Sequence, residues 1–225
     1  MYSFAQRSDT RIVDEPLYGH YLRVSGARHP GRDNILGAMD CNGDSVMSTM
    51  LGADVHGGRP VLFMKQMAHH LRDLDLAFLG SVANVLLIRD PREMLPSLTI
   101  QLPDARLDDT GLALQAWLHA RLCELGLQAV VLDSRELLLD PEGVLRQLCL
   151  ALDIHFEESM LRWEPGARPE DGIWACHWYQ AVHRSTGFAP YRRKSDCPER
   201  LTPLLDECRP YYEKLYAHAL RARTN

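Results

Sequence analysis

The chain has 225 residues, of which 46% are hydrophobic and 24% charged, a composition typical of an ordinary globular protein with a substantial core. Its formal net charge of -5 gives no support for nucleic-acid binding. No apolar run is long enough to span a bilayer, and the first residues do not resemble a signal peptide. The six cysteines are scattered without a C-x-x-C pair, so we expect reduced thiols in a cytoplasmic protein and no zinc framework.

The first predicted strand runs from Thr10 to Val13 and is stopped by Asp14-Glu15-Pro16. Residues 1–6 before it resemble the end of a helix. Two carboxylates at a strand end have two interpretations. They can cap the turn that follows, which is a common role of Asp. Alternatively, Glu15 faces the ligand-binding edge of a sheet as a base or substrate contact.

A loop-rich segment, residues 26–60, separates this strand from the next, and we expect short helices near 33–39 and 44–51. Val61 to Met64 is the second predicted strand, and Lys65 at its end is well placed to meet an anionic ligand. His69 and His70 offer a base that titrates near neutral pH. Adjacent histidines diverge on a helix and no further ligand has a suitable spacing, so we expect no metal site, and a structural role for one of them.

A third strand is predicted from the continuous apolar run Val85 to Ile88, a pattern typical of a strand covered on both faces of a parallel sheet. Asp90 can cap the helix that follows, and Pro91 suits its first turn. Arg89 then falls at the carboxyl end of the strand, where ligands of open α/β folds bind, and Ser97 could reach the same phosphate. Taken alone, the pattern equally describes a βα junction with a surface salt bridge.

The rest of the chain alternates helices with one more strand. The predicted elements are a helix over 71–80, an amphipathic helix over 110–125 with Trp117 in the core, a strand over 129–133, helices over 142–152 and 172–184, and terminal helices in 197–225. Tyr191-Arg192-Arg193-Lys194 is a basic run that suits either a solvated face or a phosphate contact. This order predicts an α/β fold of three layers with a mainly parallel sheet, in a single domain over 1–225.

Several of these segments together resemble the PAPS-dependent sulfotransferases of the P-loop nucleotide-binding superfamily, over most of the chain. The family's 3′-phosphate motif is a strand ending in Arg with Ser eight residues later, which here is Leu87-Ile88-Arg89 and Ser97. Val61 to Lys65 resembles the strand that carries the family's catalytic lysine. The segments over 130–152 and 174–188 resemble the family's acidic turn with its Asp-Pro helix and its late helix ending in Ser-Thr-Gly-Phe.

The resemblance implies transfer of a sulfuryl group from PAPS to a hydroxyl or amine of a small-molecule acceptor, without a metal. It implies that Arg89 and Ser97 hold the 3′-phosphate and that Lys65 stabilises the bridging or sulfuryl oxygens. The remaining implied roles are proton acceptor for Glu15, His69 or His70, and phosphate contacts for Arg192 and Arg193. The segments 26–60 and 164–195 are expected on the acceptor side, neither nucleic acid nor membrane is an expected partner, and an oligomer is compatible with the sequence.

The main departure from the family concerns the loop Pro-Arg-x-x-Ser-Thr that wraps the 5′-phosphosulfate, which is not found in this sequence. Residues 1–7 resemble the last turns of the helix that follows that loop. We therefore expect the first central strand to be missing from the sequence as written and PAPS to bind weakly. Three alternatives stay open: a P-loop kinase, although G-x-x-x-x-G-K-S/T is not present, a non-catalytic scaffold, and a plain nucleotide-binding module.

Overall fold

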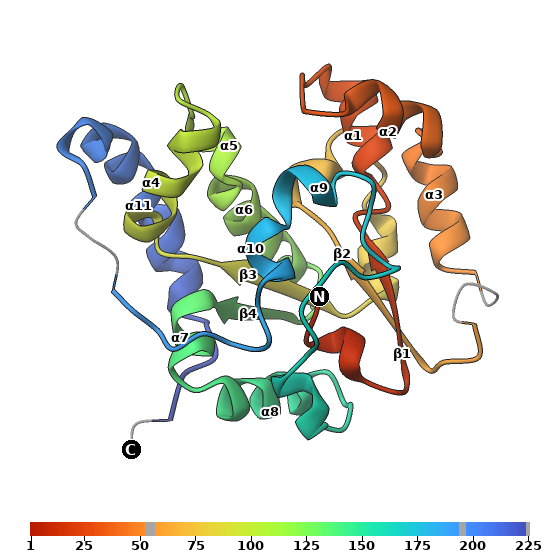
Figure 1. The fold of residues 1–225 in the computed structure, drawn as a ribbon. Helices are drawn as coiled ribbons and strands as arrows, with labels where there is room; N and C mark the ends of the chain where they lie inside the picture. The colour runs from red at the N-terminus through yellow and green to blue at the C-terminus, as the bar shows by residue number, and fades with distance from the viewer. Residues whose placement is uncertain (53–56, 194–196, 224–225) are drawn as a thin grey trace. The chain divides into compact units, whose positions relative to one another are not determined.

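The computed structural model describes residues 1–52, 57–193 and 197–223. They form an α/β fold that contains two pairs of parallel strands with helices around them (Figure 1). The predicted α/β class and the parallel pairing are confirmed. The chain divides into two compact units, one of residues Met1–Phe78 and Glu157–Phe188, the other of Leu79–Phe156 and Ala189–Asn225. Each unit has its own strand pair and its own hydrophobic core.

The strand pair of the first unit consists of β1 (Thr10–Asp14) and β2 (Val61–Lys65). They run parallel with Thr10 opposite Val61 and Asp14 opposite Lys65. The strand β1 ends where Glu15 takes a φ of 43°, a left-handed conformation that is uncommon for a residue other than glycine. This register brings a carboxylate and a lysine side by side at the carboxyl ends of the two strands.

The helices of the first unit are short. They are α1 (Tyr18–Ser25), α2 (Arg32–Ala38), α3 (Gly43–Met50), α9 (Ala175–Trp178) and α10 (Gln180–His183), with 3-10 turns at Phe4–Gln6, Ala68–Leu71 and Glu158–Leu161. The two helices predicted in the segment 26–60 are confirmed as α2 and α3. Asn42 caps α3 by accepting a hydrogen bond from the backbone N–H of Ser45. Tyr18, Leu22 and Trp174 contribute to the buried core under these helices.

The second unit is built on β3 (Asn84–Ile88) and β4 (Ala129–Asp133), which also run parallel, with Asn84 opposite Ala129. Its helices are α4 (Pro91–Gln101), α5 (Leu107–Thr110), α6 (Leu112–Glu124), α7 (Ser134–Leu139), α8 (Pro141–Ala151) and α11 (Thr202–Tyr216). The core joins the strands to α6 and α11 through Ile88, Ala116, Val131 and Leu215. The chain passes from β3 to β4 through a crossover that contains α4, α5 and α6. A parallel pair needs such a connection, because a tight turn cannot connect the carboxyl end of one strand to the amino end of the next.

Four local predictions were wrong. The helix expected over 71–80 is replaced by 3-10 turns, since Asp73 takes a φ of 51°, which an α-helix cannot contain. The segment 172–184 forms two short helices rather than one, and residues 4–6 form a 3-10 turn rather than the end of an α-helix. Trp117 is 51% exposed, because the buried side of α6 is formed by its neighbours on the helix, Leu112, Ala116 and Leu122 among them.

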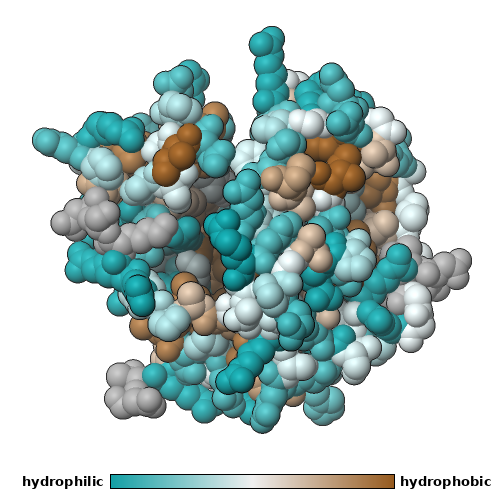
Figure 2. Space-filling model, in the orientation of Figure 1, coloured by the Kyte–Doolittle hydropathy of each residue, from teal (hydrophilic) through white to brown (hydrophobic). Residues whose placement is uncertain are grey.

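The strand β3 is covered on one face only. Val85 and Leu87 are 37% and 56% exposed, whereas Ile88 is buried. The expected cover on both faces is therefore wrong, and a sheet of two strands explains why, since few helices can pack on so small a surface. Figure 2 shows other exposed apolar side chains as brown patches on a mostly hydrophilic surface. In the described part of the chain, no helix has the length and hydropathy needed to cross a membrane.

Asp133 provides a test of how the second unit is held together. Its side chain is fully buried, accepts from the backbone N–H groups of Arg135 and Glu136 at the start of α7, and accepts from the phenol of Tyr212 on α11. We expect Asp133→Ala to lower the free energy of unfolding by about 1–3 kcal/mol, measured by urea denaturation. Asp206→Ala, which removes an exposed ion pair with Arg209, should cost less than about 0.5 kcal/mol; equal losses would contradict the assignment.

Candidate functional site

Four polar side chains meet at the carboxyl ends of β1 and β2. The Nζ atom of Lys65 donates a hydrogen bond to Oε1 of Glu15 and another, 2.8 Å long, to the hydroxyl of Tyr179. The same Nζ lies 3.8 Å from Oδ1 of Asp14. The Tyr179 hydroxyl in turn donates to the Asp14 carboxylate, at 2.8 and 2.9 Å from its two oxygens. Lys65 is therefore held by a carboxylate and a phenol, and these two partners lie close together, since the Tyr179 hydroxyl is 3.4 Å from Oε1 of Glu15.

The local backbone explains this arrangement. The strand register places Asp14 beside Lys65, and the backbone N–H of Glu15 donates to the carbonyl of Lys65 at 2.8 Å. The left-handed turn at Glu15 follows directly, so that two consecutive carboxylates stay close to one lysine. Tyr179 lies between α9 and α10, and Gly172 just before α9 donates its N–H to Oδ2 of Asp14 at 3.1 Å.

Burial and charge act in opposite directions on the pKa of Lys65 but in the same direction on the pKa of Tyr179. Burial lowers the pKa of Lys65, while the Asp14 carboxylate beside it raises that pKa. Burial also raises the pKa of the Tyr179 phenol, and the negative charge of Asp14 adds to the rise. Side-chain exposure is 27% for Lys65 but only 1% for Asp14 and 7% for Glu15. The lysine is thus more accessible to solvent than either carboxylate.

His70 lies behind Glu15, with its Nε2 atom 3.8 Å from Oε2 of that residue. Its buried ring stacks on Tyr18 and on Tyr21, each at 5.0 Å between centroids. Burial is the main cause that lowers the pKa of His70 to about 2, so the ring is neutral near physiological pH. His69 packs against the ring of Tyr21 at 4.7 Å. These contacts give His70 a packing role and make it a poor proton acceptor.

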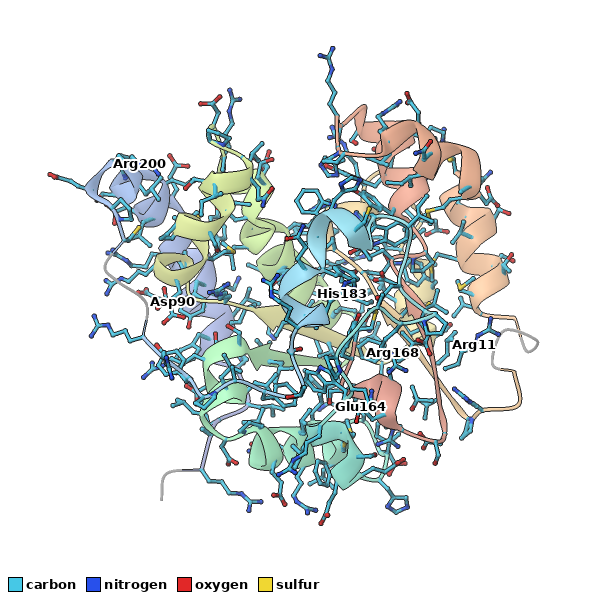
Figure 3. All side chains as sticks on the ribbon, viewed as in Figure 1. Arg11, Asp90, Glu164, Arg168, His183 and Arg200 are labelled. Atoms are coloured by element: carbon cyan, nitrogen blue, oxygen red, sulfur yellow. The ribbon has the colours of Figure 1, made fainter. Side chains whose placement is uncertain are left out.

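A second polar cluster of the same unit lies next to Gly172 in the chain. The Asp171 carboxylate accepts from the phenol of Tyr2 at 2.7 Å, and Nε2 of His183 on α10 lies 3.0 Å from it (Figure 3). Asp171 also accepts from the backbone N–H of Arg168. These bonds fix the segment that carries Gly172, and through its N–H they help to fix Asp14.

The second unit contains the Arg89 and Ser97 pair predicted from the sequence. Arg89 follows β3 directly, and Asp90 caps α4 by accepting from the N–H of Arg92 at 2.8 Å (Figure 3). The predicted strand, cap and first-turn Pro91 are confirmed. Among the described residues, the Arg89 side chain makes no hydrogen bond or ion pair. The Ser97 hydroxyl donates to the carbonyl of Met94 within its own helix, so a phosphate shared by Arg89 and Ser97 stays a prediction.

The basic run after Ala189 is anchored to the same unit. The phenol of Tyr191 donates to Oε1 of Glu93 in the first turn of α4 at 2.5 Å, and the guanidinium of Arg135 lies 5.6 Å from the Tyr191 ring centroid. Arg192 and Arg193 follow with exposed side chains, and Lys194 lies outside the described residues. The anchor keeps the basic segment close to the helix that begins beside Arg89.

Sequence reasoning found Lys65 and Glu15 but missed what holds them. It treated Asp14 as a turn cap, although a parallel register between the first two strands would have placed it beside Lys65. No sequence signal marks Tyr179, because its position depends on how a segment more than a hundred residues later packs against β1. Within the described ranges, no group of three His, Cys, Asp or Glu side chains has the arrangement of a metal site.

Comparison with known proteins shows the family to which the chain belongs. Residues 1–219 match the family model described as a sulfotransferase domain, so the chain belongs to the sulfotransferase family. The resemblance stated from the sequence is thereby confirmed.

Two curated relatives of this chain are much longer than the chain itself. Branched-chain-amino-acid aminotransferase-like proteins 2 and 1 of Arabidopsis thaliana are 36% and 39% identical to it over 220 residues. Those residues are 97% of this chain but 39% of each relative, so the chain spans about two fifths of their length. The sulfotransferase domain from the curacin biosynthetic pathway is a solved structure with 15% identity and a TM-score of 0.43, covering 89% of this chain and 78% of that one.

The burial of His70 predicts a specific pH dependence of stability. The unfolded chain binds a proton at this histidine near its ordinary pKa of about 6.5, whereas the folded chain binds it only near pH 2. Between these values the unfolded state holds more protons, so stability is lost as the pH falls. His70→Phe keeps a ring in contact with Tyr18 and Tyr21 and removes this loss.

We therefore expect the unfolding free energy of His70→Phe to fall less steeply than that of the wild type below pH 6, by about 1 kcal/mol per pH unit. Urea denaturation at pH 7, 6 and 5 measures the difference. Parallel curves for the two proteins would mean that the His70 ring takes up protons in the folded state.

Proposed function

We propose that this chain transfers a sulfuryl group from PAPS to a hydroxyl or amine of a small-molecule acceptor. The observation that carries the proposal is the contact of Lys65 with Glu15 at the carboxyl ends of β1 and β2. It joins a cation, which can stabilise negative charge on a reacting group, to a carboxylate, which can take a proton. Membership of the sulfotransferase family supports sulfuryl transfer as the reaction.

Glu15 is the best supported proton acceptor among the three candidates. It is ionised beside Lys65, and a carboxylate at the ligand-binding end of parallel strands can reach an acceptor that binds there. His70 is neutral and buried, and it stacks on two aromatic rings, which makes it a poor proton acceptor. His69 packs on the outer ring, Tyr21, and is the second choice.

Arg89 is the best supported phosphate contact. Its guanidinium has no partner among the residues that the structure describes, and next to the first turn of α4 it combines a positive charge with the N-terminal end of a helix dipole. Arg192 and Arg193, exposed beside the Tyr191 anchor, are further candidates, and Ser97 can add a hydroxyl if it leaves the Met94 carbonyl. The chemistry asked of all these side chains is positioning and charge stabilisation.

A second candidate is a scaffold of the same fold that binds a nucleotide or a partner without catalysis. The specific observation in its favour is that Pro-Arg-x-x-Ser-Thr is not found in the 225 residues. The names of the two plant relatives describe whole proteins as aminotransferase-like and do not mention sulfuryl transfer. A P-loop kinase has less support, because G-x-x-x-x-G-K-S/T is not present either.

Calorimetric titration with PAP, the product nucleotide, separates these candidates. We expect weak binding to this chain, because the backbone donors of the phosphosulfate loop are not among its motifs. Arg89→Ala should weaken that binding at least about tenfold, the effect of losing charge-assisted hydrogen bonds. Arg92→Ala, a change of the same kind on the exposed side of α4, should leave it unchanged.

The outcomes have distinct meanings. Tight PAP binding would contradict the expected weak affinity, and equal losses in the two variants would remove Arg89 from the site. Binding without transfer from radiolabelled PAPS to 4-nitrophenol would favour the non-catalytic candidate. If transfer is observed, Lys65→Ala should lower its rate by about a hundredfold or more, since it removes the charge that stabilises the transition state.

A further inference from the structure

The ammonium group of Lys65 has a defined set of partners. An ammonium has three N–H donors, and two are used, one by Glu15 and one by Tyr179. Asp14 at 3.8 Å is too far for a third hydrogen bond but close enough to attract the charge. One N–H therefore remains for a ligand, and the lysine can bind an anion without leaving either partner.

Tyr179 and Asp14 form a fixed support on one side of this ammonium. The Tyr179 hydroxyl has one proton, and the Asp14 oxygens at 2.8 and 2.9 Å are nearer acceptors than Oε1 of Glu15 at 3.4 Å, so the proton goes to Asp14 and a lone pair of the phenol oxygen is left for Lys65. Asp14 is itself held by the N–H of Gly172 and is buried. Glu15, whose Oε1 atom lies 3.4 Å from the Tyr179 hydroxyl, is the partner whose protonation changes the charge balance of the group.

We propose that the Lys65–Glu15 ion pair couples proton removal from the acceptor to charge stabilisation at the donor, and that Tyr179 and Asp14 are positioning residues that keep Lys65 in place during this change. The inference rests on the sulfuryl transfer proposed above. It adds two residues, Tyr179 and Asp14, that neither the sequence motifs nor the family match assigns.

The transfer step shows how the coupling works. The acceptor oxygen or nitrogen forms a bond to sulfur, and its proton moves to a carboxylate oxygen of Glu15. The bond between sulfur and the bridging phosphate oxygen breaks, and its electron pair stays on that oxygen. Neutral Glu15 no longer balances Lys65, so Asp14 is its one remaining carboxylate partner in this group and more of the lysine's positive charge is available as negative charge develops on the leaving group.

Without a second support, the same event would weaken the site. A lysine ammonium on its flexible four-carbon stem is strongly hydrated and turns toward water when it loses its counter-ion. The hydrogen bond from Lys65 to Tyr179 does not depend on the protonation of Glu15, and the tyrosine is tied to Asp14. The support therefore holds the ammonium at the strand end when its electrostatic partner is neutralised.

A purely structural network is the competing explanation, and two kinds of measurement separate it from the proposal. Tyr179→Phe removes both hydrogen bonds of the hydroxyl and keeps the ring. We expect kcat for transfer from PAPS to 4-nitrophenol to fall about tenfold to a hundredfold, which is the loss of one charge-assisted hydrogen bond. KM for PAPS should change less than threefold. Tyr21→Phe is the matched control, since Tyr21 stacks on His70 and does not contact Lys65.

The second measurement needs no activity. Acetylation of Lys65 by acetic anhydride is followed by peptide mass spectrometry across a range of pH. Glu15→Gln should shift the midpoint of labelling to lower pH, because it removes a carboxylate that favours the ammonium. Tyr179→Phe should instead raise the limiting rate about threefold or more, because the lysine is no longer held, and Tyr21→Phe should do neither.

Asp14→Asn and Asp14→Ala test the other end of the support. Asn keeps an oxygen that accepts from Tyr179 and Gly172, so it should retain several times the kcat of the Ala variant, provided that circular dichroism shows both to be folded. Unchanged kcat and unchanged labelling in Tyr179→Phe would overturn the positioning role alone. A wild-type chain without measurable transfer at saturating PAPS would overturn the proposed function and the coupling together, while labelling still reports whether Tyr179 holds Lys65.

Discussion

The ion pair between Lys65 and Glu15 is the interaction on which the candidate site depends. It forms because a parallel register sets Asp14 opposite Lys65, and because the chain turns sharply at Glu15 instead of continuing the strand. Two neighbouring carboxylates repel each other, and burying them with an ammonium removes water from all three charges, so the site needs further hydrogen bonds as compensation. The phenol of Tyr179 and the N–H of Gly172 provide these hydrogen bonds to Asp14. The charged groups at the strand ends therefore depend on the segment 172–179, which is far along the chain.

The polar groups of the site differ in what burial does to them. His70 is buried against two aromatic rings, burial lowers its pKa to about 2, and its ring packs behind Glu15. Lys65 keeps partial exposure, so its pKa is lowered by burial but supported by Asp14. The same unit thus makes one potential base neutral and leaves Lys65 partly exposed. This is a division of roles that residue type alone does not reveal.

The second unit organises its charges differently. Arg89 stands at a strand end without a partner in the described residues, and the nearby carboxylates Asp90 and Glu93 are used for a helix cap and for the Tyr191 anchor. A cation left unpaired beside a helix N-terminus is a ready contact for an anion. The same unit also leaves one face of β3 exposed, since a sheet of two strands leaves Val85 and Leu87 partly in solvent.

The sequence by itself determined the four strands, most of the helices, the cap at Asp90, the α/β class and the family resemblance. These depend on local patterns, in which apolar runs, Asp-Pro starts and residue spacing carry the information. It could not determine the exposed side of Trp117, the break at Asp73, the neutral state of His70 or the roles of Asp14 and Tyr179. Those depend on which residues distant in the sequence come within a few ångströms, and only the tertiary structure decided that, because burial and charge pairing arise from contacts between segments.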